Sequence, residues 1–290
     1  MSLTLGNAKQ PSEDGAFRQV ANIHSKRIMT SLEHQSLWWL SDALAPRSDR
    51  QGTQSVAVPS NLILSSLPKA VAVAVEPHLK KVELRLGDIV AESGSKTKIV
   101  YFPLTGVISL VVELSSGQMI ETAMVGRDGA VNAGAALDGQ ISLHKSIVQL
   151  AGSALVIPAQ DLAKLADTHV ALRTLIIRNE QVLLAQSQQS VACNAVHDVE
   201  SRMCRWLLRM LDLTDNRELT VTQEFLAQML GVTRPTVSII AATLQKAGYI
   251  SYRRGNIRVL NVAGLKDGTC ECYDSVRSQY ARMLKPRKTT

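Results

Sequence analysis

The chain has 290 residues, of which 46% are hydrophobic, and its formal net charge is +7. This length is sufficient for two domains and a tail. The longest apolar runs, near residues 70–75 and 107–112, are far too short to cross a bilayer, and the N-terminus shows no export signal, so we expect a cytoplasmic protein. The patterns GxxxxGK, GxSxG and HExxH are missing from the sequence, which argues against an enzyme.

The first part of the chain gives weak structural signals. Residues 1–57 mix Gln, Ser, Asp, Gly and Arg without sustained periodicity, so we expect a disordered tail. One exception is residues 36–44, where leucines at helical spacing flank Trp38 and Trp39 and predict a short amphipathic helix. A helical pattern then runs from residue 61 to about residue 79, with breaks near Pro68 and Pro77.

The middle of the chain alternates apolar and polar residues with a period of two. The predicted strands are residues 82–86, 99–102, 107–114, 118–125, 141–150 and 154–157. Gly87, Gly106 and Gly117 lie in the turns between them. Short strands at this spacing indicate a sandwich or barrel-like β domain.

A long helix is predicted over residues 170–196, which contain no Gly or Pro. Its apolar face comprises Leu172, Leu175, Ile176, Val182, Leu183, Val191 and Val196. Asn179, Gln186 and Gln189 interrupt that face, so a strict coiled coil is not established. The helix either covers the β domain or pairs with a second copy of the chain. A further helix is predicted over residues 198–211.

Residues 221–250 predict two helices joined by a tight turn. Thr222 suits the N-cap of the first helix, and Gly231 supplies the positive φ that ends it. Thr233 caps the second helix, with Pro235 in its first turn, and Gly248 ends that helix. Its buried stripe consists of Val237, Ile240, Ala241 and Leu244. This segment is a predicted helix-turn-helix.

A basic hairpin follows, with strands at residues 249–252 and 257–260 around the turn Arg253-Arg254-Gly255-Asn256. Residues 216–290 contain 12 Lys and Arg against 5 Asp and Glu, whereas residues 1–215 hold 20 of each, so the whole excess of +7 lies in the C-terminal part. Such segregation favours a winged helix that binds DNA, and we prefer two-fold pairing through residues 170–196. The alternative is a module whose winged helix contacts protein while the β domain binds a ligand.

This order of segments resembles the Crp/Fnr family of bacterial transcription regulators over about residues 61–265. The resemblance is most specific in TQEFLAQMLGVTRPTVSIIAATLQKAGYI and YRRGNIRV, and LRLGDIVAESG with IVYFPLTGVISLV is similar to the early strands of the family's sensor domain. It implies an α+β fold with a cyclic-nucleotide-binding-like β-roll (58–166), a dimerisation helix (167–197) and a winged helix-turn-helix (198–290) after the tail (1–57). It also implies a homodimer on a pseudo-palindromic operator, with double-stranded DNA and RNA polymerase as partners.

The same resemblance implies individual DNA contacts. Arg234 matches the recognition-helix arginine that contacts bases in cyclic-AMP-binding members, and Ser238 matches the base-contacting serine of oxygen-sensing members. Pro235 and Ile239 depart from the Glu and Arg common at these positions, so the operator need not be a familiar family sequence. The other contacts implied are Thr222, Gln223, Thr233 and Thr236, as phosphate contacts or helix caps, and Arg253, Arg254 and Arg258 of the wing.

The predicted sensor domain departs from the nucleotide-binding members. These carry Gly-Glu and, about ten residues later, an arginine that meets the cyclic phosphate. Here Gly129 is followed by Ala130, and the later position reads His144-Lys145-Ser146. We therefore expect an effector other than a cyclic nucleotide, of unknown identity, and no cofactor. His144 could be a haem or metal ligand, but a lone strand histidine is more often solvated.

The four cysteines are Cys193, Cys204, Cys270 and Cys272. The first two lie in helical patterns with apolar neighbours, as buried free thiols commonly do. Cys270 and Cys272 are too closely spaced for an ordinary zinc knuckle, and no second Cys/His pair is near them in sequence. Since the four are divided between distant segments, we expect no metal site and no iron–sulfur cluster, and a thiol redox switch is left open.

Overall fold

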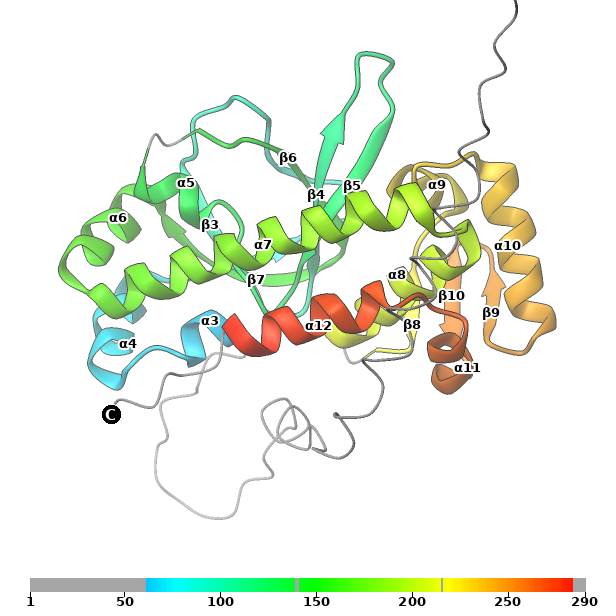
Figure 1. Ribbon diagram of the computed structural model, residues 1–290. Helices are drawn as coiled ribbons and strands as arrows, with labels where there is room; N and C mark the ends of the chain where they lie inside the picture. Colours follow the sequence, from blue (N-terminus) through cyan, green and yellow to red (C-terminus); the bar gives the residue numbers. More distant parts are fainter. Residues whose placement is uncertain (1–60, 139–140, 215, 284–290) are drawn as a thin grey trace, which may run out of the picture. The chain divides into compact units, whose positions relative to one another are not determined.

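The computed structural model describes residues 61–138, 141–214 and 216–283, all of which belong to the unit Gln54–Thr290. The predicted tail at residues 1–57 and the predicted helix at residues 36–44 lie outside the described residues. From residue 61 onward, helices and strands follow the order shown in Figure 1.

The described chain begins with short helices, α3 (Leu62–Ser65), α4 (Lys69–Val75) and the 3-10 helix η1 (Glu76–His78). The predicted breaks are confirmed, because α4 follows Pro68 and Pro77 lies within η1. Asn61 anchors this segment and is fully buried. Its side-chain oxygen accepts from the N–H of Ile63 and Leu64, while its amide donates to the carbonyl oxygens of Pro103 at 3.0 Å and Gly129 at 2.9 Å.

Two antiparallel sheets form the β domain, as the alternating pattern predicts. The strands are β1 (Lys80–Leu84), β2 (Ile89–Ala91), β3 (Ile99–Pro103), β4 (Val107–Glu113), β5 (Met119–Val125), β6 (Lys145–Leu150) and β7 (Gly152–Pro158). One sheet has the order β1-β7-β3 and the other β2-β6-β4-β5. The strand predicted from residue 141 begins only at Lys145, because Ser142 bonds to the loop residue Ser95 instead.

Helices α5 (Ala133–Leu137), α6 (Ala159–Thr168) and α7 (Val170–Val196) pack against these sheets and one another. The predicted extent of α7 is confirmed, but its predicted apolar face is partly wrong. Val191 and Val196 are exposed, whereas Asn179 and Gln186 are buried. The polar pair is tolerated because each amide has a partner: Asn179 exchanges two hydrogen bonds with the backbone of Ala130, and Gln186 accepts from the Tyr280 hydroxyl at 2.9 Å.

Tyr280 belongs to α12 (Cys272–Met283), a helix that is not among those predicted from the sequence. This helix follows α11 (Val262–Asp267) and lies alongside α7 (Figure 1). The buried face of α7 is therefore covered by the chain itself, in part by the β domain and in part by α12.

The C-terminal part contains α8 (Val199–Thr214), β8 (Glu218–Thr220), α9 (Gln223–Leu230), α10 (Arg234–Lys246), β9 (Ile250–Arg253) and β10 (Asn256–Val259). The strands form a sheet of order β8-β10-β9, in which β8 is an addition to the predicted hairpin. Trp206 of α8 is buried in the core of this part. A buried ion pair between Arg209 of α8 and Asp128, at 2.7 Å, links α8 to the β domain.

Candidate nucleic-acid interface

Helices α9 and α10 meet at 103°, within the range of about 90–120° that is typical of a helix-turn-helix. Local signals produce this bend. Gly231 ends α9 with a φ of 63°, a conformation that costs glycine little. Thr222 accepts a hydrogen bond from the Phe225 N–H at 3.1 Å, and Thr233 accepts one from the Thr236 N–H at 3.5 Å. Thr222 and Thr233 are therefore helix caps, whatever else they contact.

The interior face of the two helices is apolar and buried, as the spacing predicts. Leu226 of α9 packs with Val237, Ala241 and Leu244 of α10 in the same core as Trp206. Ile240 is only partly buried against this core. The guanidinium of Arg202 in α8 donates to the carbonyl oxygen of Leu230, which fixes the end of α9 against α8.

The opposite face of α10 is open to solvent, and Arg234 lies on it. The same exposed face carries Pro235, Ile239, Thr243 and Lys246. Ile239 is 67% exposed. Ile239 and Lys246 were not among the predicted contacts, although they lie four and eleven residues after exposed Pro235, on the same side of the helix.

Ser238 lies at the edge of this face and is only half-buried. Its hydroxyl donates to the side-chain oxygen of Gln223 at 2.8 Å and approaches the carbonyl oxygen of Arg234 at 3.1 Å. The structure thus brings together two predicted contacts, Gln223 at the start of α9 and Ser238 on α10. The Gln223 side-chain nitrogen carries N–H donors that the bond from Ser238 does not use.

The wing turns at Arg254 and Gly255, which have φ values of 52° and 77°. Two consecutive residues with positive φ make the tight turn that suits the twist of a β-hairpin. The wing is held to the start of α9, because the Tyr252 hydroxyl donates to the Val221 carbonyl oxygen at 2.9 Å and the Val221 N–H donates to the Gly255 carbonyl oxygen at 2.8 Å. The recognition and wing elements are therefore one connected surface.

Charge on this surface is mainly positive. Its exposed cationic residues are Arg234, Lys246, Arg253, Arg254 and Arg258. Arg258 is partly compensated, because its Nε lies 3.5 Å from a carboxylate oxygen of Glu218 on β8. Burial raises the pKa of Tyr252 to about 12, an effect that the charge of Arg234 opposes, so Arg234 lies near the wing tyrosine. The surface therefore presents α10 with cationic side chains around it, and such side chains can contact the phosphates of DNA.

Comparison with known proteins agrees with this geometry. Residues 201–267 match the Crp-like helix-turn-helix domain. The matched residues run from α8 through the helix-turn-helix and the wing to α11. No curated protein matches it significantly.

Solved structures share the fold of this chain at low identity. FixK2 from Bradyrhizobium japonicum is 16% identical with a TM-score of 0.58, over 66% of this chain and 98% of FixK2. A transcriptional regulator of the CRP family from Thermus thermophilus is 21% identical with a TM-score of 0.54, over 64% of this chain and 95% of its own. The c-di-GMP-responsive global regulator CLP from Xanthomonas campestris is 16% identical with a TM-score of 0.54, over 67% of this chain and all of CLP. The described part of the chain thus shares the fold of these structures.

Among the described residues, no single helix is long and apolar enough to span a membrane. The bent pair α9 and α10 reaches that length and apolar content only when the two helices are taken together.

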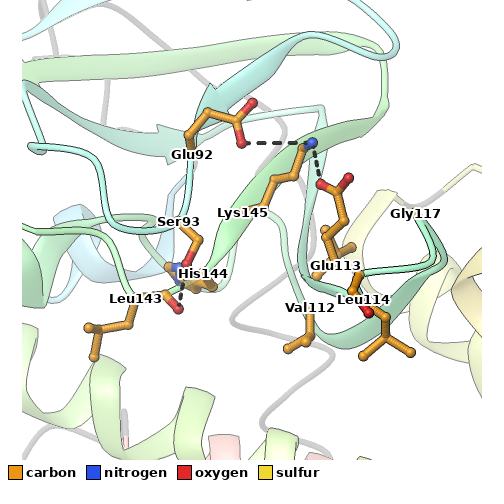
Figure 2. Close-up of a pocket in the computed structure, with 11 residues that line it drawn as sticks. Glu92, Ser93, Val112, Glu113, Leu114, Gly117, Leu143, His144 and Lys145 are labelled. Atoms are coloured by element: carbon orange, nitrogen blue, oxygen red, sulfur yellow. Dashed lines mark hydrogen bonds and ion pairs between the residues drawn. The ribbon is translucent and has the colours of Figure 1, made fainter.

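Ala130 and Lys145 stand where nucleotide-binding members of the family carry Glu and Arg, and both are already bonded to other residues of the chain. Both backbone polar groups of Ala130 bond to Asn179 of α7, at 2.9 and 3.0 Å. Lys145 lies 2.7 Å from a carboxylate oxygen of Glu113 and 3.7 Å from one of Glu92, as Figure 2 shows. His144 lies beside it, its Nδ1 3.3 Å from the Ser142 hydroxyl oxygen, and burial lowers its pKa.

The expectation that the four cysteines lie apart is wrong for three of them. Cys193, Cys270 and Cys272 form one buried cluster, and the Sγ atoms of Cys193 and Cys270 are 3.6 Å apart. His197, which no sequence pattern singles out, joins this cluster with its Nδ1 3.6 Å from the Sγ of Cys272. Cys204 is buried in the core of the C-terminal part, as its apolar neighbours predict.

Proposed function

We propose that the chain is a Crp/Fnr-type transcription regulator. As a homodimer it binds a pseudo-palindromic operator, with α10 of each copy in a major groove and each wing on the backbone. The exposed cationic face of α10 carries this proposal. Helix-turn-helix dimers of this kind place their recognition helices about 34 Å apart, one turn of DNA. The division of the chain into a sensor (58–166), a dimerisation helix (167–197) and a DNA-binding domain (198–290) is part of the same proposal.

A stripe of exposed apolar residues on α7 supports the homodimer. Val170, Ile177, Leu184 and Val191 are 76%, 48%, 60% and 68% exposed and follow one another at intervals of seven residues. A seven-residue interval drifts by only about 20° around a helix, so these four side chains form one stripe. Since α12 and the β domain cover a different face of α7, a second α7 is the partner that would bury this stripe.

Each predicted contact has a role in this proposal. Arg234 and Ser238 face bases, and exposed Ile239 suits the methyl group of a thymine. Gln223, Thr222, Thr233 and Thr236 lie where helix N-termini approach phosphates. Arg253, Arg254 and Arg258 contribute charge from the wing. RNA polymerase is the protein partner that regulation of transcription implies.

The effector of this proposal is not a cyclic nucleotide. A cyclic phosphate needs a free cation, whereas the position that corresponds to the family's arginine is Lys145, which two carboxylates already engage. The backbone at Ala130 is likewise bonded to α7. Any effector would act by binding two arrangements of the dimer with different affinity.

Selection of bound sites from random DNA with the purified full chain tests the proposal. We expect sites with two inverted half-sites about 10 base pairs apart and a dimer by light scattering. The variant Leu184→Lys should be monomeric and bind the selected site far more weakly. Val196→Lys is the matched control, since Val196 is 78% exposed on the same helix but off the stripe, and it should remain a dimer. Single, unpaired half-sites and a monomeric wild type would refute the proposal.

The second candidate is a protein-interaction module, with the winged helix on a partner protein. The apolar Ile239 in the middle of the exposed face favours it. A DNA affinity that changes little with salt concentration would support this second candidate, whereas the proposed operator binding requires a steep salt dependence.

A further inference from the structure

Four side chains from two distant segments of the regulator converge at the end of α7. Cys193 and His197 lie four residues apart there, on one side of the helix, and Cys270 and Cys272 flank Glu271 at the start of α12. The potential ligand atoms of the four lie within 4.8 Å of one another. Cys193, Cys270 and Cys272 are buried, and His197 is partly exposed. Three thiols and an imidazole are a common ligand set for zinc.

The distances within this cluster fit one tetrahedral zinc ion. With Zn–S bonds of about 2.3 Å and Zn–N bonds of about 2.0–2.1 Å, tetrahedral geometry places two sulfurs about 3.8 Å apart and a sulfur and a nitrogen about 3.6 Å apart. The Sγ atoms of Cys193 and Cys270 are 3.6 Å apart, and the Sγ of Cys272 is 3.6 Å from the Nδ1 of His197. Small side-chain adjustments would complete the tetrahedron.

Polar neighbours of the cluster form an outer shell of the kind that metal sites require. The Nε2 of His197, the ring nitrogen that faces away from Cys272, lies 3.3 Å from a carboxylate oxygen of Glu271. This contact holds Nδ1 toward the sulfurs, as a carboxylate does for a metal-bound histidine. The side-chain amide of Gln189 donates to the Sγ of Cys272 at 3.0 Å.

Positive charge also lies close to the cluster. Burial raises the pKa of Cys193, and the charge of Arg205 on α8 opposes this rise. Three thiolates with a divalent cation leave one net negative charge, which Arg205 offsets. The surroundings therefore suit the complex better than they suit three free thiols.

We propose that Cys193, His197, Cys270 and Cys272 bind one Zn²⁺ ion in a closed four-ligand site. The ion would fasten the start of α12 to the end of α7, where the chain continues into α8. Since all four positions are filled by protein, the site has a structural role and no open position for catalysis. Binding releases the thiol protons, so the zinc affinity rises with pH.

Two other chemistries use the same thiols, and the geometry is less favourable to each. A disulfide between Cys193 and Cys270 would leave Cys272, His197 and their outer shell without a role. An iron–sulfur cluster places several atoms between its ligands, whereas these four ligand atoms lie close enough to share a single ion. Both chemistries are distinguishable outcomes of the test.

Metal analysis of the full-length protein, purified without chelator, is the test. We expect about one Zn per chain, no iron and no sulfide, and a loss of thermal stability when a chelator removes the zinc. Co²⁺ added to the stripped protein should produce the absorption of tetrahedral cobalt with thiolate ligands. Refilling with Zn²⁺ should bleach this absorption and restore stability.

Variants separate the site from general folding. Cys272→Ser should lose the zinc, whereas Cys204→Ala, which alters a buried cysteine outside the cluster, should keep it. Glu271→Gln should keep all four ligands but weaken zinc binding about 10–100-fold. This exposed substitution leaves the core intact, so it remains informative if Cys272→Ser misfolds.

The proposal is overturned if the wild-type protein retains no zinc and takes up neither Zn²⁺ nor Co²⁺ when its thiols are reduced. Iron with sulfide, or a Cys193–Cys270 disulfide found by mass spectrometry in the protein as purified, would overturn it too. None of these results depends on DNA binding, so failure here leaves the proposed function untouched.

Discussion

The hydroxyl of Ser238 donates a hydrogen bond to the side-chain oxygen of Gln223 at 2.8 Å and so joins the exposed edge of α10 to the first residue of α9. Both residues lie where DNA would contact the helix-turn-helix. The bond fixes the rotamer of each side chain and leaves the Gln223 amide N–H groups and the Ser238 lone pairs for DNA. We therefore expect the two residues to recognise DNA as a unit.

A double-mutant cycle checks this coupling. Ser238→Ala and Gln223→Ala should each lower affinity for the selected operator, and the double variant should lose less than the sum of the two losses. The difference should be about 0.5–1.5 kcal/mol, the net worth of a hydrogen bond. Thr243→Ala is the control, because its hydroxyl bonds back to the Ile239 carbonyl oxygen, and its effect should add to the others. Strict additivity of the Gln223 and Ser238 effects would refute the coupling.

Arg234 should determine sequence preference. It is exposed at the start of α10, where a guanidinium can bridge two acceptors on a guanine. Arg234→Ala is expected to cost about 1–3 kcal/mol at the preferred operator and to relax specificity at one base pair of each half-site. Affinities for operators mutated at single positions measure this. An equal loss on every sequence would show that Arg234 contacts only the backbone.

Arg254 should contribute charge without specificity. Because its φ is 52°, Asn is a better replacement than Ala, since Asn tolerates a left-handed backbone and keeps the wing turn. Arg254→Asn should weaken binding to specific and random DNA alike and reduce the salt slope by about one unit per protomer. Its thermal stability should match or exceed that of the wild type. A loss confined to the specific operator would contradict this role.

Glu121 should make stability depend on pH. Its carboxyl is buried beside Ser109, and burial raises its pKa to about 7, against the bond from Ser109 and the nearby charge of Arg205. The Ser109 hydroxyl oxygen also lies 2.7 Å from the side-chain oxygen of Gln149. Because the hydroxyl has a single proton, it cannot donate fully to both Glu121 and Gln149. A protonated Glu121 can instead donate to the Ser109 oxygen.

A carboxyl whose pKa is higher in the folded state binds its proton more tightly when folded. Stability should therefore fall as the pH rises from about 4.5 to about 7, by about 3 kcal/mol, and this contribution should stay lost above pH 7. Denaturant unfolding across this range measures the slope. Glu121→Gln, which can also donate to Ser109, should flatten it and be more stable than the wild type at pH 8. Glu83→Gln, an exposed change on β1, should leave the slope as it is.

The sequence by itself determined the helix-turn-helix and its wing, because their signals are local. Each helix has a threonine cap that accepts a hydrogen bond from a backbone N–H only three residues later. Gly231 ends α9 with a positive φ, which glycine adopts because it has no side chain. Alternation likewise located most strands of the β domain, although it placed the start of β6 four residues too early. These features depend on residues that are close together in the sequence, so the sequence alone predicts them.

Only the tertiary structure decided which face of α7 is buried and where the cysteines meet. Gln186 interrupts the apolar face of α7 in the sequence, but in the structure it accepts a hydrogen bond from Tyr280, 94 residues away on α12. Cys193 and Cys270 are separated by 77 residues and by 3.6 Å. Periodicity reports which side of a helix avoids water, but it carries no information about the partner that supplies a hydrogen bond or a ligand.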